Sequence, residues 1–312
     1  MNKLHYLFLL LAAAITFTSC SNDDDGGTND DGGGTSQEGP NVNKNIVTDE
    51  PAVARLEFPR LKEGNNKVIV YRTTDNRTYD KDRVNYAVEW DCDKKSQRWA
   101  CYQMHKGYGG SYSRVVDGYM NDTQNLSSDE YYSTDYIYRS GYEHGHICPN
   151  ADRTYSYRAN YQTFYMTNMQ PQYHKFNGFT NKGSDQGEGL WVRMENWLRD
   201  ITPSNTTDTL YVCKGGTIDD DENIIERLQG RLIVPRYFFV ALLMKNSMGY
   251  KAIGLWFEQK ENEWRDSEPL SNFAVTIDRL EELTGIDFFC NLPDDIENDR
   301  ESTMAINTWA LD

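Results

Sequence analysis

The chain has 312 residues, of which 38% are hydrophobic and 13% aromatic, and it carries a formal net charge of -16. This negative charge argues against a module that holds nucleic acid by summed electrostatic attraction, because such modules present clustered Lys and Arg to the phosphates. It does not exclude an enzyme that uses a divalent cation, since a bound cation supplies positive charge locally.

The first twenty residues have the layout of a secretory signal. Met1-Asn2-Lys3 precedes an apolar run from Leu7 to Ile15, which is too short to span a bilayer, and small residues then precede Cys20. This ending resembles the processing site of bacterial lipoproteins, so we expect residues 1–19 to be removed and Cys20 to be diacylated as a membrane anchor. An ordinary cleaved signal with an incidental Cys is the alternative.

The lipidated Cys20 and a disordered acidic tether are predicted to occupy residues 20–50, because Asp, Gly, Asn and Thr there bury too little apolar surface to order the chain. The block Asp23-Asp24-Asp25 resembles signals that send some bacterial lipoproteins to the outer face of the outer membrane, and a merely solvated linker is the alternative. We therefore expect an exported lipoprotein at the outer membrane or cell surface.

Residues 51–312 suit one large mixed domain. Runs at 67–71, 85–90 and 98–102 are strand-like and separated by turn signals, which predicts an antiparallel sheet. The polar segment 106–135 predicts a long surface loop, and such loops inside compact domains are usually functional.

The second half of the domain predicts a helix and further strands. Apolar residues spaced three and four apart predict a helix over 189–198, with Glu195 at the edge of its buried stripe. The remaining segments are three nearly continuous apolar strands, expected to be buried on both faces, and a strand followed by a helix that ends at Gly285: 209–213, 237–244, 251–257 and 271–285. The fold class is therefore α+β, with a central antiparallel or mixed sheet flanked by helices.

Five cysteines follow Cys20, which in an oxidising compartment suggests disulfides, although their number is odd. Cys92 and Cys101 flank a polar turn, so we predict a bridge between them across a hairpin. The sequence gives no pairing for the other three.

A polar constellation in the middle of the chain points to phosphodiester chemistry: Glu143-His144-Gly145-His146, Thr167-Asn168-x-x-Pro171-Gln172, Asn177 and Trp191-x-x-x-Glu195. His146 can act as a base, because a neutral imidazole accepts a proton from water. Amide oxygens such as those of Asn177 and Asn168 suit Mg²⁺, which tolerates few protein ligands. A carboxylate such as Glu195 can hold the waters of the metal.

This constellation is similar to that of the DNA/RNA non-specific endonucleases, whose ββα-metal (His-Me finger) site opens with Asp-Arg-Gly-His. The resemblance covers most of residues 68–293. It implies a metal-dependent enzyme that cuts DNA and RNA, with Mg²⁺ as the expected cofactor and Mn²⁺ or Ca²⁺ as other candidates. It further implies that His146 is the general base, Asn177 the protein ligand of the metal, Glu195 the organiser of the metal's water shell and Asn168 a residue that steadies the site.

Two further site residues follow from the resemblance on position alone. Arg114 is the candidate for the upstream phosphate-binding Arg of the family, and His144 stands where the family has Arg. An imidazole is cationic only at lower pH and lacks the bidentate fork of a guanidinium, so we expect weaker or pH-dependent transition-state stabilisation. Extra residues over 178–188 make Asn181 a rival of Asn177 as metal ligand.

Two functions of other classes compete with this interpretation. Tyr155, Tyr157 and Tyr161 lie near the motif and could stack on sugar rings, which would suit a surface glycan-binding lipoprotein. The other alternative is an inactive nuclease fold that binds a partner. The sequence itself predicts no protein partner.

Overall fold

A computed structural model of the chain describes residues 40–74, 81–180 and 186–311. The chain divides into two compact units, residues 1–37 and 38–312, and the described residues belong to the second. The predicted signal, Cys20 and most of the predicted tether lie outside them. Within the described ranges, the structure contains no helix with both the length and the apolar character needed to cross a membrane.

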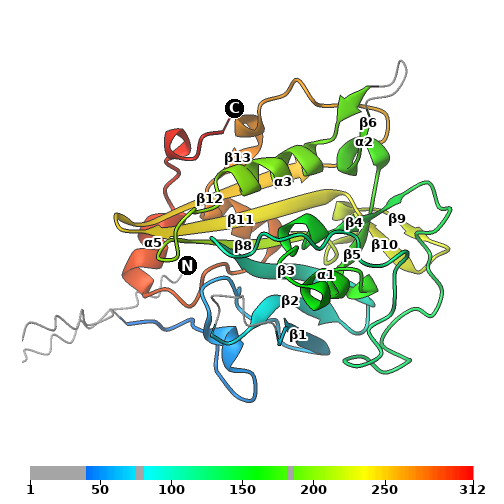
Figure 1. The fold of residues 1–312 in the computed structure, drawn as a ribbon, viewed down its shortest axis with the longest axis horizontal. Helices are drawn as coiled ribbons and strands as arrows, with labels where there is room; N and C mark the ends of the chain where they lie inside the picture. Colours follow the sequence, from blue (N-terminus) through cyan, green and yellow to red (C-terminus); the bar gives the residue numbers. More distant parts are fainter. Residues whose placement is uncertain (1–39, 75–80, 181–185, 312) are drawn as a thin grey trace, which may run out of the picture. The chain divides into compact units, whose positions relative to one another are not determined.

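A seven-stranded sheet forms the centre of the unit, in the order β1-β2-β3-β8-β11-β12-β13 (Figure 1). Every neighbouring pair in it is antiparallel. Its strands are β1 (Asn66–Arg72), β2 (Val84–Asp91), β3 (Ser96–Met104), β8 (Thr209–Gly216), β11 (Tyr237–Asn246), β12 (Gly249–Glu258) and β13 (Ala274–Val275). The predicted α+β class with a central sheet is confirmed.

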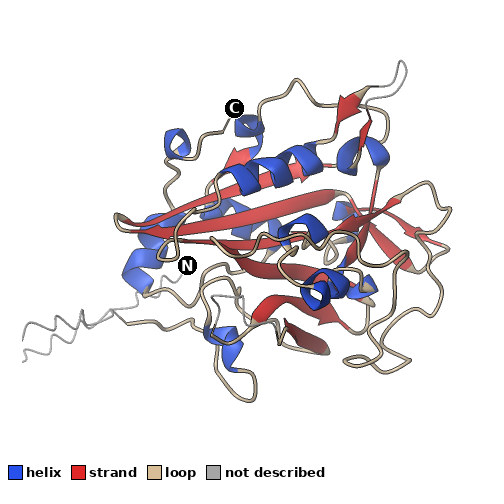
Figure 2. Ribbon diagram, in the orientation of Figure 1, coloured by secondary structure: helices blue, strands red, loops and turns tan. Residues whose placement is uncertain are grey.

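Shorter elements surround this sheet (Figure 2). The two-stranded sheets pair β4 (Glu143–His146) with β5 (Met169–Gln172), β6 (Phe179–Thr180) with β7 (Gly187–Glu188), and β9 (Ile224–Leu228) with β10 (Leu232–Pro235). The α-helices are α1 (Tyr157–Gln162), α2 (His174–Asn177), α3 (Leu190–Asp200), α4 (Ile277–Thr284) and α5 (Asp294–Glu301). The short 3-10 helices are Pro51–Ala54, Asn150–Asp152, Met166–Asn168, Asp221–Asn223, Leu270–Phe273 and Ile306–Thr308.

Both faces of the central sheet are buried. Along β11, Phe238 and Val240 pack into a hydrophobic cluster that includes Trp191 of α3. The intervening Phe239 packs into a second cluster with Leu280 of α4. Because successive side chains of a strand point to opposite faces, α3 covers one face of the sheet and α4 the other. This burial explains the nearly continuous apolar sequence of the central strands.

The predicted tether boundary at residue 50 was wrong. The side chain of Asn45 is buried and donates hydrogen bonds to the carbonyl oxygens of Val53 at 3.1 Å and Pro59 at 2.9 Å. Asn41 likewise donates to the carbonyl oxygen of Cys290 at 3.1 Å. The sequence argument considered only apolar surface, whereas this segment is ordered by asparagine side chains that satisfy buried backbone groups. The folded unit therefore includes residues 40–50.

The predicted bridge between Cys92 and Cys101 was also wrong. All five cysteines of the described chain are free and buried. Cys92 packs in the cluster that contains α3, whereas Cys101 packs in the cluster on the opposite face of the sheet. Flanking a turn in sequence does not set the face to which a side chain points, and here the two thiols point apart.

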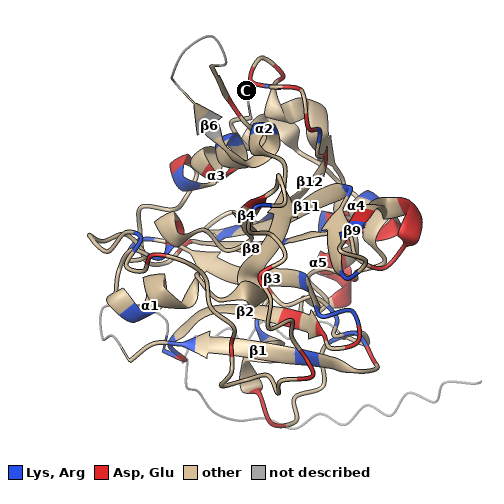
Figure 3. Ribbon diagram, turned by 90° about the vertical axis from the view of Figure 1, so that its right-hand side faces the viewer, with Lys and Arg blue, Asp and Glu red and all other residues tan. Residues whose placement is uncertain are grey.

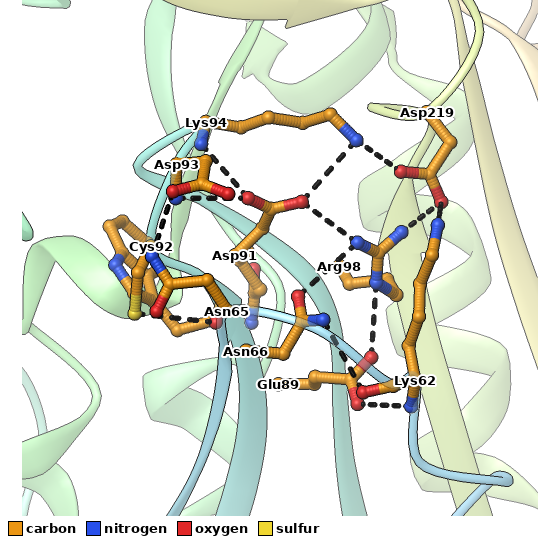
Figure 4. A network of polar contacts seen from close by, with 12 residues as sticks. Lys62, Asn65, Asn66, Glu89, Asp91, Cys92, Asp93, Lys94, Arg98 and Asp219 are labelled. Carbon is orange, nitrogen blue, oxygen red and sulfur yellow. Dashed lines mark hydrogen bonds and ion pairs between the residues drawn. The ribbon is translucent and has the colours of Figure 1, made fainter.

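A buried ionic network joins β2 and β3 to the segment that follows β8 (Figure 4). Arg98 of β3 is 3% exposed and pairs with Asp91 at 2.9 Å, with Glu89 at 3.0 Å and with Asp219. Lys62, whose side chain is about half exposed, pairs with Asp219 at 2.9 Å. Glu89 is almost fully buried, and this burial raises its pKa.

We expect Arg98→Met to lower the free energy of unfolding by about 3–5 kcal/mol, because buried carboxylates would lose their counter-ion. Urea denaturation of the purified protein measures this change. In the control Lys62→Met the lost pair is solvent-exposed, so the cost should be under about 1 kcal/mol. Equal losses in the two variants would contradict the central role of Arg98 in the network.

Candidate active site

Strand β4 carries two histidines to one face of a short antiparallel pair. His146 lies opposite Met169 of β5. Between the histidines, a Cβ atom at Gly145 would lie 2.2 Å from Cδ of Gln172, so a larger residue there would displace this buried side chain. His144 and His146 are two residues apart and therefore project to the same side.

A cleft of about 520 Å³ opens beside β4. It brings together five of the six predicted site residues, which come from the long loop, β4, α2 and α3: Arg114, His144, His146, Asn177 and Glu195. In Figure 1, β4, α2 and the beginning of α3 lie next to one another along one end of the sheet. Segments far apart in sequence thus contribute to a single polar space.

The imidazole of His146 is held in its neutral form. Burial lowers its pKa to about 3, with further lowering from the charges of Arg114 and His144. Its ring meets Phe164 edge-on at 5.2 Å between centroids, and its Nε2 atom is buried without a hydrogen-bond partner. The indole N–H of Trp191 donates to the carbonyl oxygen of His146 at 3.1 Å, which fixes the backbone of this residue. The imidazole is therefore uncharged at neutral pH.

Asn177, the last residue of α2, lies in the same cleft with its amide oriented. Its Nδ2 donates to Oε2 of Glu143 at 3.0 Å, and Oε1 of Glu143 pairs with Nδ1 of His174. With the amide nitrogen engaged, the amide oxygen is the atom that can ligate a cation. Both oxygens of the Glu143 carboxylate are therefore engaged by side chains of α2.

The close approach of α2 and α3 positions Asn177 beside Glu195. A Cβ atom at Gly189, directly before α3, would lie 2.2 Å from the carbonyl oxygen of Phe176, so only glycine allows the two helices to meet this closely. Trp191 and Met194 are fully buried on the inner side of α3. Glu195 follows Met194 and reaches the cleft from the edge of that buried face.

Glu195 is accompanied by a buried lysine that sequence reasoning missed. Burial raises the pKa of Glu195 to about 7, and Lys214 of β8 opposes this shift from 3.9 Å. Lys214 is fully buried, its Nζ makes no hydrogen bond, and that atom lies 4.8 Å from the centroid of the Trp191 ring. The sequence feature that could have pointed to Lys214 is its place directly after the apolar run 209–213.

Two arginines line the cleft. Arg114, predicted on position alone, lies there with a positive φ of 40° and with its guanidinium 5.6 Å from the centroid of Phe164. Arg139 also lines the cleft, and no pattern in the sequence singled it out. Its guanidinium lies over the ring of Tyr138 at 5.0 Å. The long loop and the segment before β4 thus bring positive charge to a chain whose net charge is negative.

His144 is fixed beside His146 by two contacts. Its ring stacks on Tyr119 at 3.9 Å between centroids, and its Nε2 lies 2.8 Å from Oδ2 of Asp135. Burial raises the pKa of Asp135, but the hydrogen bond and the charge of His144 outweigh that effect, so the pKa of Asp135 is lowered. The position held by Arg in the family motif is therefore occupied by an imidazole that is anchored to a carboxylate.

Asn168, expected to steady the site, does not itself line the cleft. Its side chain is fully buried, accepts from the N–H of Cys148 at 2.8 Å, and donates to the carbonyl oxygens of Cys148 and Thr163 at 2.8 Å each. Asn168 therefore holds the segment that follows His146 in place. The rival ligand Asn181 lies outside the described residues.

The donors of the cleft fit a hard divalent cation. Asn177 offers an amide oxygen and Glu195 a carboxylate. In the described part of the chain, no group of three His, Cys, Asp or Glu residues with ligand spacing lies in this cleft. An ion there would be held by few protein atoms and would keep several waters, which is the usual coordination of Mg²⁺ in enzymes.

The three tyrosines of the glycan-binding hypothesis do not form one exposed face. Tyr155 is 2% exposed and donates to Oδ1 of Asn85 at 2.9 Å. Tyr157 and Tyr161 stack at 6.2 Å between centroids. A sugar could therefore reach at most two of the three rings.

Comparison with known proteins gives one family. The model of the family described as DNA/RNA non-specific endonuclease matches residues 64–295. A nuclease of Nostoc sp. (strain PCC 7120) is 27% identical over 232 residues, which covers 70% of this chain and 76% of the relative. The mitochondrial nuclease EXOG of Homo sapiens is 25% identical over 239 residues, covering 73% of this chain and 61% of the relative.

A solved structure shares the fold. The crystal structure of an EndoG/EndoGI complex contains a chain that superposes with a TM-score of 0.56 at 18% sequence identity. The match covers 79% of this chain and 94% of that chain. It is consistent with a ββα-metal fold.

Proposed function

Because the chain belongs to the DNA/RNA non-specific endonuclease family, we propose that it is a metal-dependent endonuclease that hydrolyses phosphodiester bonds of DNA and RNA. The observation that carries the proposal is the single cleft in which a neutral His146 faces the same space as Asn177 and Glu195. A base and a cation ligand must meet at one phosphorus for this reaction.

His146 takes the proton of the attacking water at its unpartnered Nε2. Asn177 would hold the cation, Mg²⁺ or a substitute such as Mn²⁺ or Ca²⁺, through its amide oxygen. When bound, the cation supplies charge neutralisation at the phosphate and leaving oxygens. Glu195 would accept hydrogen bonds from the waters bound to the cation. Arg114 would pair with a phosphate oxygen of the substrate.

We expect the purified protein to nick supercoiled plasmid and to degrade RNA in Mg²⁺, and to lose both activities in EDTA. The reason is that the cleft offers too little positive charge of its own to stabilise the transition state. Gel electrophoresis of the products measures both, and added Mg²⁺ or Mn²⁺ should restore cleavage after chelation.

Undiminished cleavage in EDTA would contradict the metal requirement. Absence of cleavage with every divalent ion would instead favour the inactive binding protein. Retention of the protein in native gels that contain oligosaccharide, without cleavage, would favour the glycan-binding hypothesis.

The mature protein is proposed to be an exported lipoprotein of the outer membrane or cell surface, with Cys20 diacylated. The supporting feature is the apolar run and small residues before Cys20. We expect the parent expressed in its host to partition into the detergent phase and Cys20→Ser to partition into the aqueous phase, because the acyl chains would be lost. Equal partitioning of both would contradict the anchor.

A further inference from the structure

An acidic cluster lies on the face of the sheet opposite to the cleft, where α4 meets α5. Asp278 and Glu281 belong to α4, and Glu301 is the last residue of α5. One carboxylate oxygen from each lies within 4.8 Å of the other two. Figure 3 shows acidic residues gathered on these helices. Three like charges at this separation repel strongly unless a proton or a cation lies between them.

Glu301 makes the cluster unusual. It is 6% exposed, and its Oε1 atom is buried without a hydrogen-bond partner. A buried carboxylate without a partner is costly. Its position at the end of α5 adds to this cost, because the C-terminal carbonyls of a helix carry partial negative charge.

The neighbours of Glu301 are also acidic. Burial raises the pKa of Glu301 to about 10, and Glu281, Glu297, Asp287 and Asp278 raise it further. Burial raises the pKa of Glu281 to about 8, although this residue accepts a hydrogen bond from the N–H of Phe288. The Glu297 carboxylate accepts a hydrogen bond from the side-chain amide of Asn43 at 3.0 Å.

We propose that Asp278, Glu281 and Glu301 bind a structural divalent cation, for which Ca²⁺ is the best fit. Calcium–oxygen distances are about 2.4 Å, so two ligands of one Ca²⁺ lie at most about 4.8 Å apart. Mg²⁺ demands a stricter octahedron than Ca²⁺, which accepts a flexible arrangement of carboxylate oxygens. Bound Ca²⁺ would tie α4 to α5 and neutralise Glu301. The inference does not depend on catalysis in the cleft.

The test uses the full chain carrying Asn177→Ala, so that the proposed ligand of the cleft is absent. After removal of metals at pH 8, CaCl₂ alone is titrated while calorimetry follows Tm. We expect Tm to rise by about 5 °C at a hundredfold excess over Kd. Adding Glu301→Gln should abolish this rise, and should itself raise Tm in the absence of Ca²⁺ because the cost of burying a carboxylate is removed.

The matched control is Glu282→Gln on the same helix, since Glu282 pairs with Arg279 outside the cluster. This variant should keep the full response to Ca²⁺. A Tm that does not change with Ca²⁺ would overturn the proposal and would indicate that the carboxylates share protons instead. A rise that survives Glu301→Gln would also overturn it, because Ca²⁺ would then bind elsewhere.

Discussion

His146→Ala is expected to reduce the initial rate of plasmid cleavage by about 10²–10⁴-fold at saturating Mg²⁺, because it removes the general base. The ratio of parent to variant rates should be the same at pH 5.5 and pH 8.5. Burial lowers the pKa of His146 to about 3, so the imidazole is neutral at both values. With a pKa near the ordinary value of about 6.5, the ratio would instead shrink at pH 5.5.

The control is His174→Ala, which removes a half-exposed histidine that contacts Glu143 and does not line the cleft. It should keep the rate within a few-fold of the parent, since Glu143 can still accept from Asn177. A His146→Ala variant that cleaves as fast as the parent would show that another group takes the proton.

Asn177→Ala is expected to weaken the apparent affinity for Mg²⁺ by at least about 10-fold. Loss of a residue that only hydrogen-bonds to a metal ligand typically costs about 10–100-fold, and loss of a ligand itself should cost no less. The rate at an Mg²⁺ concentration that saturates the parent should fall accordingly. The physical reason is that the amide oxygen is the proposed neutral ligand, and Glu143 fixes the orientation of this amide. Cleavage rates measured across an Mg²⁺ titration separate the loss of metal from the loss of chemistry.

Two variants control for this result. Asn177→Asp keeps an oxygen ligand and should retain more activity than Asn177→Ala. Asn196→Ala on α3 removes an exposed amide that pairs with Glu188, away from the cleft, and should leave the Mg²⁺ dependence unchanged. If Asn177→Ala shows the same Mg²⁺ dependence as the parent, the metal is held elsewhere, for example by Asn181.

The fold was predicted mainly from the spacing of apolar residues along the sequence. The apolar residues of 189–198 recur at helical spacing, and the structure places a helix at Leu190–Asp200. The apolar runs at 237–244 and 251–257 form neighbouring strands buried on both faces. The hairpin of β9 and β10 was not predicted, and neither was α5. Helix α5 is mostly charged, so it has no apolar stripe from which to recognise it.

The motif predicted which residues share a cleft, but not how each is held there. Sequence spacing identified His146, Asn177 and Glu195, and the structure places all three around one space. It could not show that Asn168 turns inward, because backbone partners are set by the tertiary fold. Lys214 was missed for the same reason, since its burial depends on how β8 packs against α3.

The most direct test of the account is a crystal structure of the protein soaked in Mn²⁺, with the ion located by its anomalous scattering. We expect a peak in the cleft, within coordination distance of the Asn177 amide oxygen and beside His146. A crystal that binds Mn²⁺ elsewhere and shows no peak in this cleft would contradict the claim that base and cation act together on one phosphate.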